Sequence, residues 1–97
     1  MTKTLPQLGL AAGAAGWKAG HAAVQSGALV IDGLDDDADQ TERLETYAAE
    51  LARVYMRERV AAHGLTPAEG ARLFGVYMYA FSRGALDQAL DGGALLR

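Results

Sequence analysis

The second half of the chain carries two runs of apolar residues at helical spacing. From about residue 40 to 63 the apolar positions are Leu44, Tyr47, Leu51, Val54 and Tyr55, filled in by Ala48, Ala61 and Ala62. From about residue 67 to 90 they are Phe74, Tyr77, Met78, Phe81 and Ala85, with Leu73, Ala80 and Leu90 beside them. Residues that recur every three or four positions share one face of an α-helix, so both runs predict helices.

The apolar face of the second run is wider than one neighbouring helix can cover. A helix with so broad an apolar face has to be covered on two sides in water. The first run supplies one side. The other side must come from the N-terminal segment or from another copy of the chain.

The junction between the two runs contains signals for both a helix end and a helix start. Gly64 suits the left-handed conformation that closes many helices, and Leu65 is then placed to contact Val60. Residues 66–69, Thr-Pro-Ala-Glu, have the sequence of a capping box with Pro67 at the first helical position. A connection this short predicts a helical hairpin.

Glycine and alanine dominate residues 4–27, which also begin with a possible capping box, Thr-Leu-Pro-Gln. The glycines, with Ala23 in the one gap, recur every three or four residues and predict a seam of small residues against which another helix can pack closely. They are Gly9, Gly13, Gly16, Gly20 and Gly27, and a bulky ridge of Leu10, Trp17 and Val24 lies beside them. Because an interior glycine disfavours a helix by about 1 kcal/mol relative to alanine, a flexible arm is the alternative interpretation.

Length and composition limit the architecture to one small domain. With 97 residues, 51% of them hydrophobic and 22% charged, the chain can form one core but not two. Strand-forming residues are scarce, so we expect an all-α fold over residues 1–97: a glycine- and alanine-rich N-terminal helix, an acidic linker over 32–39, and a helical hairpin over 40–90. Cysteine is absent and no secretory or membrane-spanning segment is evident, which predicts a cytoplasmic protein without a membrane partner.

Negative charge is concentrated in residues 32–50. The whole chain has a net charge of −3, whereas this segment alone holds eight acids and one arginine. It does not fit a calcium-binding loop, because Gln40 and Thr46 stand where the turn glycine and the bidentate glutamate belong. We expect no metal ion and no cofactor.

The same acids could serve a helix start or a partner. Asp39 is the predicted N-cap of the first hairpin helix, with Glu42 as its capping partner. The local field is strong enough to attract a basic protein surface. The candidate residues for that contact are Asp35, Asp36, Asp37, Asp39, Glu42 and Glu45.

Residues 65–84 resemble the helix-turn-helix of phage-repressor-type DNA-binding proteins. The resemblance puts Ala71 where the helices cross, Gly75 in the turn and Phe81 as the apolar anchor of the recognition helix. It implies contact with DNA, but the reading face would carry a single basic residue, Arg83, and the chain is acidic. One continuous helix through Gly75 is the favoured interpretation.

No set of residues typical of a catalytic site is evident. Neither His21 nor His63 has a nucleophile in a recognisable motif, so we expect no enzymatic activity. The apolar surplus and the glycine seam instead predict a self-associating protein-protein interaction module, a homodimer in the simplest case. The expected helix-packing or oligomer contacts are Gly9, Gly13, Gly16, Trp17, Gly20, Tyr77, Met78 and Phe81. The alternative is an acidic inhibitor or regulator, of the phage or mobile-element type, that binds a basic, nucleic-acid-binding surface through residues 32–50.

Overall fold

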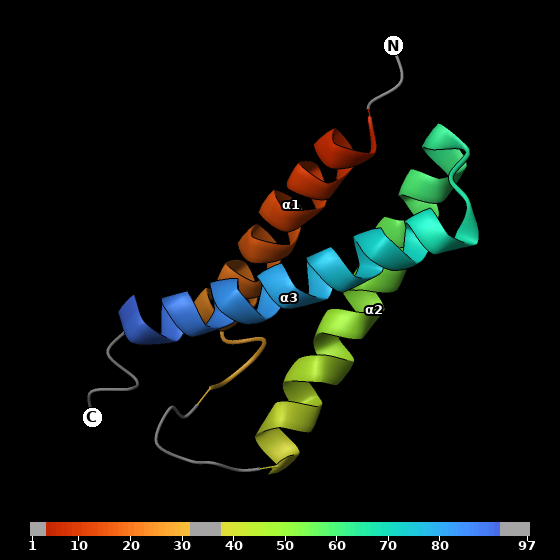
Figure 1. The fold of residues 1–97 in the computed structure, drawn as a ribbon. Coiled ribbons are helices and arrows are strands. Elements are labelled where there is room, and N and C mark those ends of the chain that lie inside the picture. The colour runs from red at the N-terminus through yellow and green to blue at the C-terminus, as the bar shows by residue number, and fades with distance from the viewer. Residues whose placement is uncertain (1–3, 32–37, 92–97) are drawn as a thin grey trace.

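The computed structural model describes residues 4–31 and 38–91, and over these ranges it contains three α-helices and no strand (Figure 1). α1 spans Leu5–Gln25, α2 spans Ala38–His63 and α3 spans Pro67–Asp91. The all-α prediction is confirmed, as is the arrangement of a hairpin plus an N-terminal helix. α1 is ordered as a helix, so the flexible-arm alternative for residues 4–27 is wrong.

α3 is the central helix of the fold. Figure 1 shows it crossing both other helices, and the contacts between helices are mainly those of α3 with α1 and of α3 with α2. α1 packs on α3 more extensively than α2 does. The N-terminal segment therefore supplies the second cover that the broad apolar face of α3 needs, and a second copy of the chain is not required for it.

Two capping boxes fix the starts of α1 and α3. Gln7 donates its backbone N–H to the Thr4 hydroxyl at 3.4 Å, and the Gln7 side-chain oxygen accepts the Thr4 backbone N–H at 2.9 Å. In the second box, Glu69 donates its backbone N–H to the Thr66 hydroxyl at 3.2 Å, and the Glu69 carboxylate accepts the Thr66 backbone N–H at 2.9 Å. Hydrogen bonds from the backbone and then the hydroxyl of Thr66 lower the pKa of Glu69 below its ordinary value. Both predicted boxes are confirmed, because a capping box is satisfied by residues three apart in sequence.

Glycines close α1 and α2. Gly27 and Gly64 have positive φ values of 82° and 62°, in the left-handed region that favours glycine. The Leu65 N–H then donates to the Val60 carbonyl oxygen at 3.3 Å, as the sequence predicts for a Schellman ending. The tight connection that follows turns the chain from α2 into α3.

The start of α2 differs from the prediction. The helix begins at Ala38, so Asp39 lies inside its first turn and is not the N-cap. Asp35, Asp36 and Asp37 lie outside the described residues, as does most of the predicted acidic linker.

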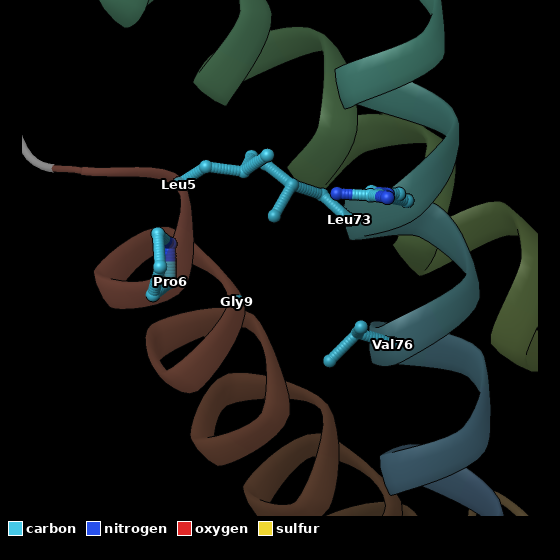
Figure 2. Close-up of a pocket in the computed structure, with 6 residues that line it drawn as sticks. Leu5, Pro6, Gly9, Leu73 and Val76 are labelled. Carbon is cyan, nitrogen blue, oxygen red and sulfur yellow. The ribbon is translucent and has the colours of Figure 1, made fainter.

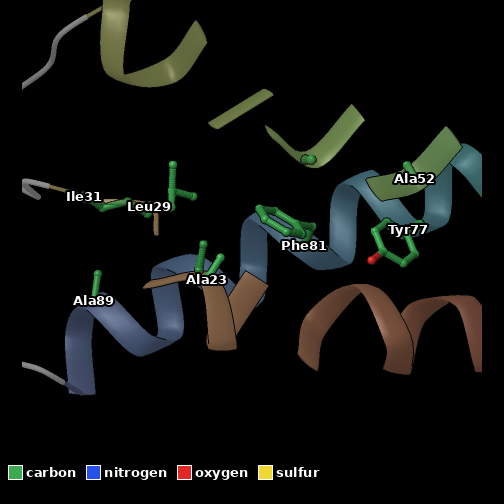
Figure 3. Close-up of a cluster of buried hydrophobic side chains, with 9 residues drawn as sticks. Ala23, Leu29, Ile31, Ala52, Tyr77, Phe81 and Ala89 are labelled. Carbon is green, nitrogen blue, oxygen red and sulfur yellow. The ribbon is translucent and has the colours of Figure 1, made fainter. Parts of the chain in front are cut away.

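Half of the buried core residues are alanines and half are larger apolar side chains. Phe81 is 0% exposed, and Figure 3 shows it in the middle of the main cluster, between Leu29 and Tyr77. Leu29 and Ile31, from the segment after α1, close one end of this cluster. The buried alanines are Ala12, Ala23, Ala48, Ala52, Ala85 and Ala89. Side chains this small let the helices approach closely, but each of them buries little apolar surface.

α3 runs without interruption through Gly75. A helix-turn-helix over residues 65–84 needs a turn there, and Ala71, which would sit at the helix crossing, is exposed. The segment therefore has the favoured structure of one continuous helix and lacks the geometry that the DNA-binding resemblance implies.

Candidate functional site

The close contact between α1 and α3 is made by glycines from both helices. A Cβ atom at Gly16 would lie 2.5 Å from the Tyr77 carbonyl oxygen, and one at Gly20 would collide with the Phe81 carbonyl. Gly84 of α3 approaches the Trp17 carbonyl in the same way from the other side. Of the predicted seam, Gly16 and Gly20 lie in this contact. Gly84 was missed, although an interior glycine in a predicted helix is itself a sign of close packing.

The other predicted seam glycines do not take part in this contact. A Cβ at Gly9 would meet nothing within 4 Å, and one at Gly13 would make an ordinary 3.7 Å contact with Val76. Gly27 lies beyond the end of α1. The buried row is instead Leu8, Ala12, Gly16, Gly20 and Ala23. Most of these residues are four apart, the spacing of the ridges by which globular helices commonly cross, whereas the prediction assumed a heptad seam.

The ridge beside the seam is only partly covered. The Trp17 Nε1–H donates to the Asp87 Oδ2 of α3 at 2.8 Å, and the indole stacks on His21 with ring centroids 4.9 Å apart. Leu10, in contrast, is 77% exposed. Val24, the third ridge residue, is half-buried against the main cluster. The ridge therefore packs on the rest of the chain at Trp17 and Val24 but is open at Leu10, and it does not form a continuous packing surface.

Tyr77, Met78 and Phe81 pack within the chain. The rings of Tyr77 and Tyr55 lie 5.1 Å apart, and those of Phe81 and Tyr47 lie 5.8 Å apart, so two aromatic pairs join α3 to α2. Tyr77 and Phe81 are buried and Met78 is half-buried against the same cluster. All three pack on other parts of the same chain, and their burial leaves Tyr77 and Phe81 unavailable as contacts between copies.

Burial makes the stability of the fold depend on Tyr77 at high pH. Loss of hydration, and then the nearby Tyr55 and Tyr47, raise the pKa of Tyr77 above its ordinary value. The folded chain therefore holds this proton more tightly than the unfolded chain. The resulting stabilisation is complete below the unfolded pKa of about 10 and is lost as the pH rises through the folded value.

We expect Tyr77→Phe to lose less unfolding free energy than the parent chain as the pH is raised from neutrality past the tyrosine range. Urea unfolding followed by circular dichroism at a series of pH values measures this difference. Tyr79→Phe is the matched control, because Tyr79 lies on the same helix and is 71% exposed. Parallel pH curves for the parent and Tyr77→Phe would contradict the assignment.

The outer face of α2 carries an apolar stripe that the rest of the described chain leaves open. Leu51 is 36% and Val54 52% exposed, although both are predicted to face the core. α3 packs instead on the neighbouring row that contains Ala48 and Ala52, both fully buried. Leu44 and Tyr47 are in line with this exposed pair but are half-buried against the main cluster. The four residues together form what we call the α2 stripe: Leu44, Tyr47, Leu51 and Val54. Its spacing of three, four and three residues is that of a heptad seam.

A groove lies between the start of α1 and the first turns of α3. Figure 2 shows Leu5 and Leu73 pointing toward one another, with Val76 across from Gly9. The groove has a volume of about 360 Å³, and Pro6 and Arg72 complete its lining. None of these side chains is a nucleophile or a general base at neutral pH, so the groove offers no chemistry of its own.

Possible metal ligands do not gather in one place among residues 4–31 and 38–91. Among those residues, no three His, Asp or Glu come close enough together to hold a metal ion. Glu42 and Glu45 of the predicted acidic face are exposed on α2, as a contact with a partner would require. Within residues 4–31 and 38–91, no helix combines the length and the apolarity that a bilayer crossing needs.

The strongest candidate site of this chain is therefore a surface, the α2 stripe, and not a pocket lined with reactive groups. Comparison with models of known protein families, with curated proteins and with solved structures gave no match.

Proposed function

We propose that this chain is a small helical protein-protein interaction module without catalytic activity, and that it binds a partner helix through the α2 stripe. The observation that carries the proposal is the exposure of Leu51 and Val54 at heptad spacing with Leu44 and Tyr47. An apolar stripe at this spacing is how one helix packs against another. Self-association is the simplest form of this function.

The glycine seam contributes to this function indirectly. Gly16, Gly20 and Gly84 are used in the contact between α1 and α3, so they hold the module together and do not reach a partner. The interaction surface has to come from side chains that the three helices leave uncovered. On α2 these include Leu51 and Val54, because the helix turns Ala48 and Ala52 toward α3.

Photo-crosslinking in the cells that produce the protein tests the proposal. We expect benzoylphenylalanine at position 54 to give protein adducts at a yield several times that at position 53, an exposed site on the same helix that lies away from the stripe. The adducts are to be resolved by denaturing electrophoresis and identified by mass spectrometry. Equal yields at the two positions would refute binding through the α2 stripe.

The same experiment addresses the acidic alternative. An inhibitor that acts on a basic surface would use the acidic segment, of which Glu42 and Glu45 are exposed. A probe at position 45 would then give the dominant adduct, with a partner whose crosslinked peptides are rich in lysine and arginine. In that case the acidic-face function replaces the one proposed.

A further inference from the structure

We propose that the partner of the α2 stripe is α2 of a second copy of this chain, packed antiparallel and in one register. This inference rests on the proposed function and names its partner. The charged residues on one side of the stripe are complementary to those of a second copy. The uncharged residues on its other side favour an antiparallel over a parallel pair of α2 helices.

The solvent side of the stripe is flanked by charges of alternating sign. Arg43, Glu50 and Arg57 are seven residues apart, and all three are exposed. Each lies three or four residues from Tyr47 or Val54, so on a helix it borders the stripe. Charges in this position decide which helices pair and in which direction.

An antiparallel pair brings opposite charges together. Glu50 then lies near Arg57 of the second copy, and twofold symmetry repeats the contact with the roles exchanged. In a parallel pair the flanking charges would instead face the positions on the other side of the stripe. Those positions hold Ala48, which is buried against α3, and Tyr55, which packs on Tyr77. A parallel pair therefore gains no ion pair.

The antiparallel arrangement with these ion pairs fixes the register of the apolar residues. Leu51 lies opposite Val54 of the second copy, Tyr47 opposite its Glu58, and Leu44 opposite its Ala61. The two most exposed members of the stripe thereby cover each other at the centre of the contact. The contact area of one helix face per chain is small, so the dimer should be weak and dependent on concentration.

Disulfide trapping tests the direction and register, and the absence of native cysteine makes the test clean. A disulfide needs Cα atoms within about 7 Å. In the proposed dimer, Leu44 and Ala61 of the other copy meet this condition, whereas two copies of Leu44 are roughly 25 Å apart at 1.5 Å per residue. We expect a mixture of Leu44→Cys and Ala61→Cys chains, equilibrated in a glutathione buffer, to give the mixed disulfide dimer in large excess over either symmetric dimer.

Other patterns overturn the inference. A symmetric dimer of Leu44→Cys would indicate parallel pairing. No disulfide dimer from any mixture, in a protein that still sediments as a dimer, would place the contact elsewhere. A monomer at all concentrations, with a different protein crosslinked at position 54, would leave the proposed function standing and remove the second copy as the partner.

Charge reversal tests the ion pairs independently of the disulfides. We expect Glu50→Arg alone and Arg57→Glu alone each to weaken dimerisation by about tenfold, and the double variant to restore it, as sedimentation equilibrium at low salt would measure. Arg53→Glu is the matched control, with the same change of charge on an exposed site away from the stripe. Circular dichroism of each variant verifies that α2 is intact. Equal weakening by the control, or no recovery in the double variant, would refute the pairing of Glu50 with Arg57.

Discussion

Replacing Phe81 by alanine should lower the free energy of unfolding by about 3–5 kcal/mol, the cost of removing a large aromatic side chain from a core. Phe81 is 0% exposed and is one of the two largest side chains that are fully buried. It also joins the three helices, because the cluster around it includes Ala23 of α1, the Tyr47 ring of α2 and Ala85 of its own helix. The alanines around it cannot fill the space it leaves. Urea unfolding followed by circular dichroism measures the loss.

Tyr79→Ala provides the comparison for this prediction. It removes an aromatic ring from the same helix, but from the outer face, and should change the unfolding free energy by no more than about 0.5 kcal/mol. A loss at Tyr79 as large as that at Phe81 would mean that α3 is covered on its outer face as well. The assignment of Phe81 as the central residue of the core would then be contradicted.

The same single methyl group should have opposite effects at two glycines of α1. Gly20→Ala is expected to lower the unfolding free energy by about 2 kcal/mol, because the steric cost of the added methyl group exceeds the gain in helix propensity. The new Cβ would meet the backbone of α3 at Phe81 and Ala85, and backbone atoms cannot move aside as a flexible side chain can. α1 would have to shift away from α3.

Gly9→Ala should instead raise the unfolding free energy, by about 0.5–1 kcal/mol. Nothing lies within 4 Å of its Cβ position, so the substitution only reduces the conformational freedom of the unfolded chain. The two variants have the same composition as each other, with one glycine fewer and one alanine more than the parent, and thermal or urea unfolding compares them directly. If both stabilise the fold, the close approach of α1 to α3 at Gly20 is refuted.

Small and large apolar residues have different places in this fold. Glycine and alanine lie at the contacts between helices and let α1, α2 and α3 approach closely. Few large side chains are buried between the helices as a result. The larger residues Leu51 and Val54 remain at the surface of α2, where they supply the contact that we propose for a partner helix. If the chain associates through this surface as we propose, the contact adds apolar burial to a core in which half of the buried residues are alanines.

The residues that end and start helices were predictable from sequence. Thr4, Gly64, Thr66 and Glu69 act through hydrogen bonds and backbone conformations that span a few residues, so their sequence context is enough to assign them. The all-α class followed in the same way from composition and periodicity. Asp39 is the exception, because α2 starts at Ala38.

The sequence by itself therefore determined the three helices and most of their ends, while the tertiary structure alone decided which faces meet. Periodicity identifies an apolar side of a helix but gives neither the neighbour nor the crossing angle. That is why Leu51 and Val54 were assigned to the core, and why Gly9 and Gly16 received the same role. Only the packing of α3 between α1 and α2 decides that Gly16 must remain glycine whereas Gly9 need not. The same packing decides which row of α2 is buried and which residues of the α2 stripe are left exposed.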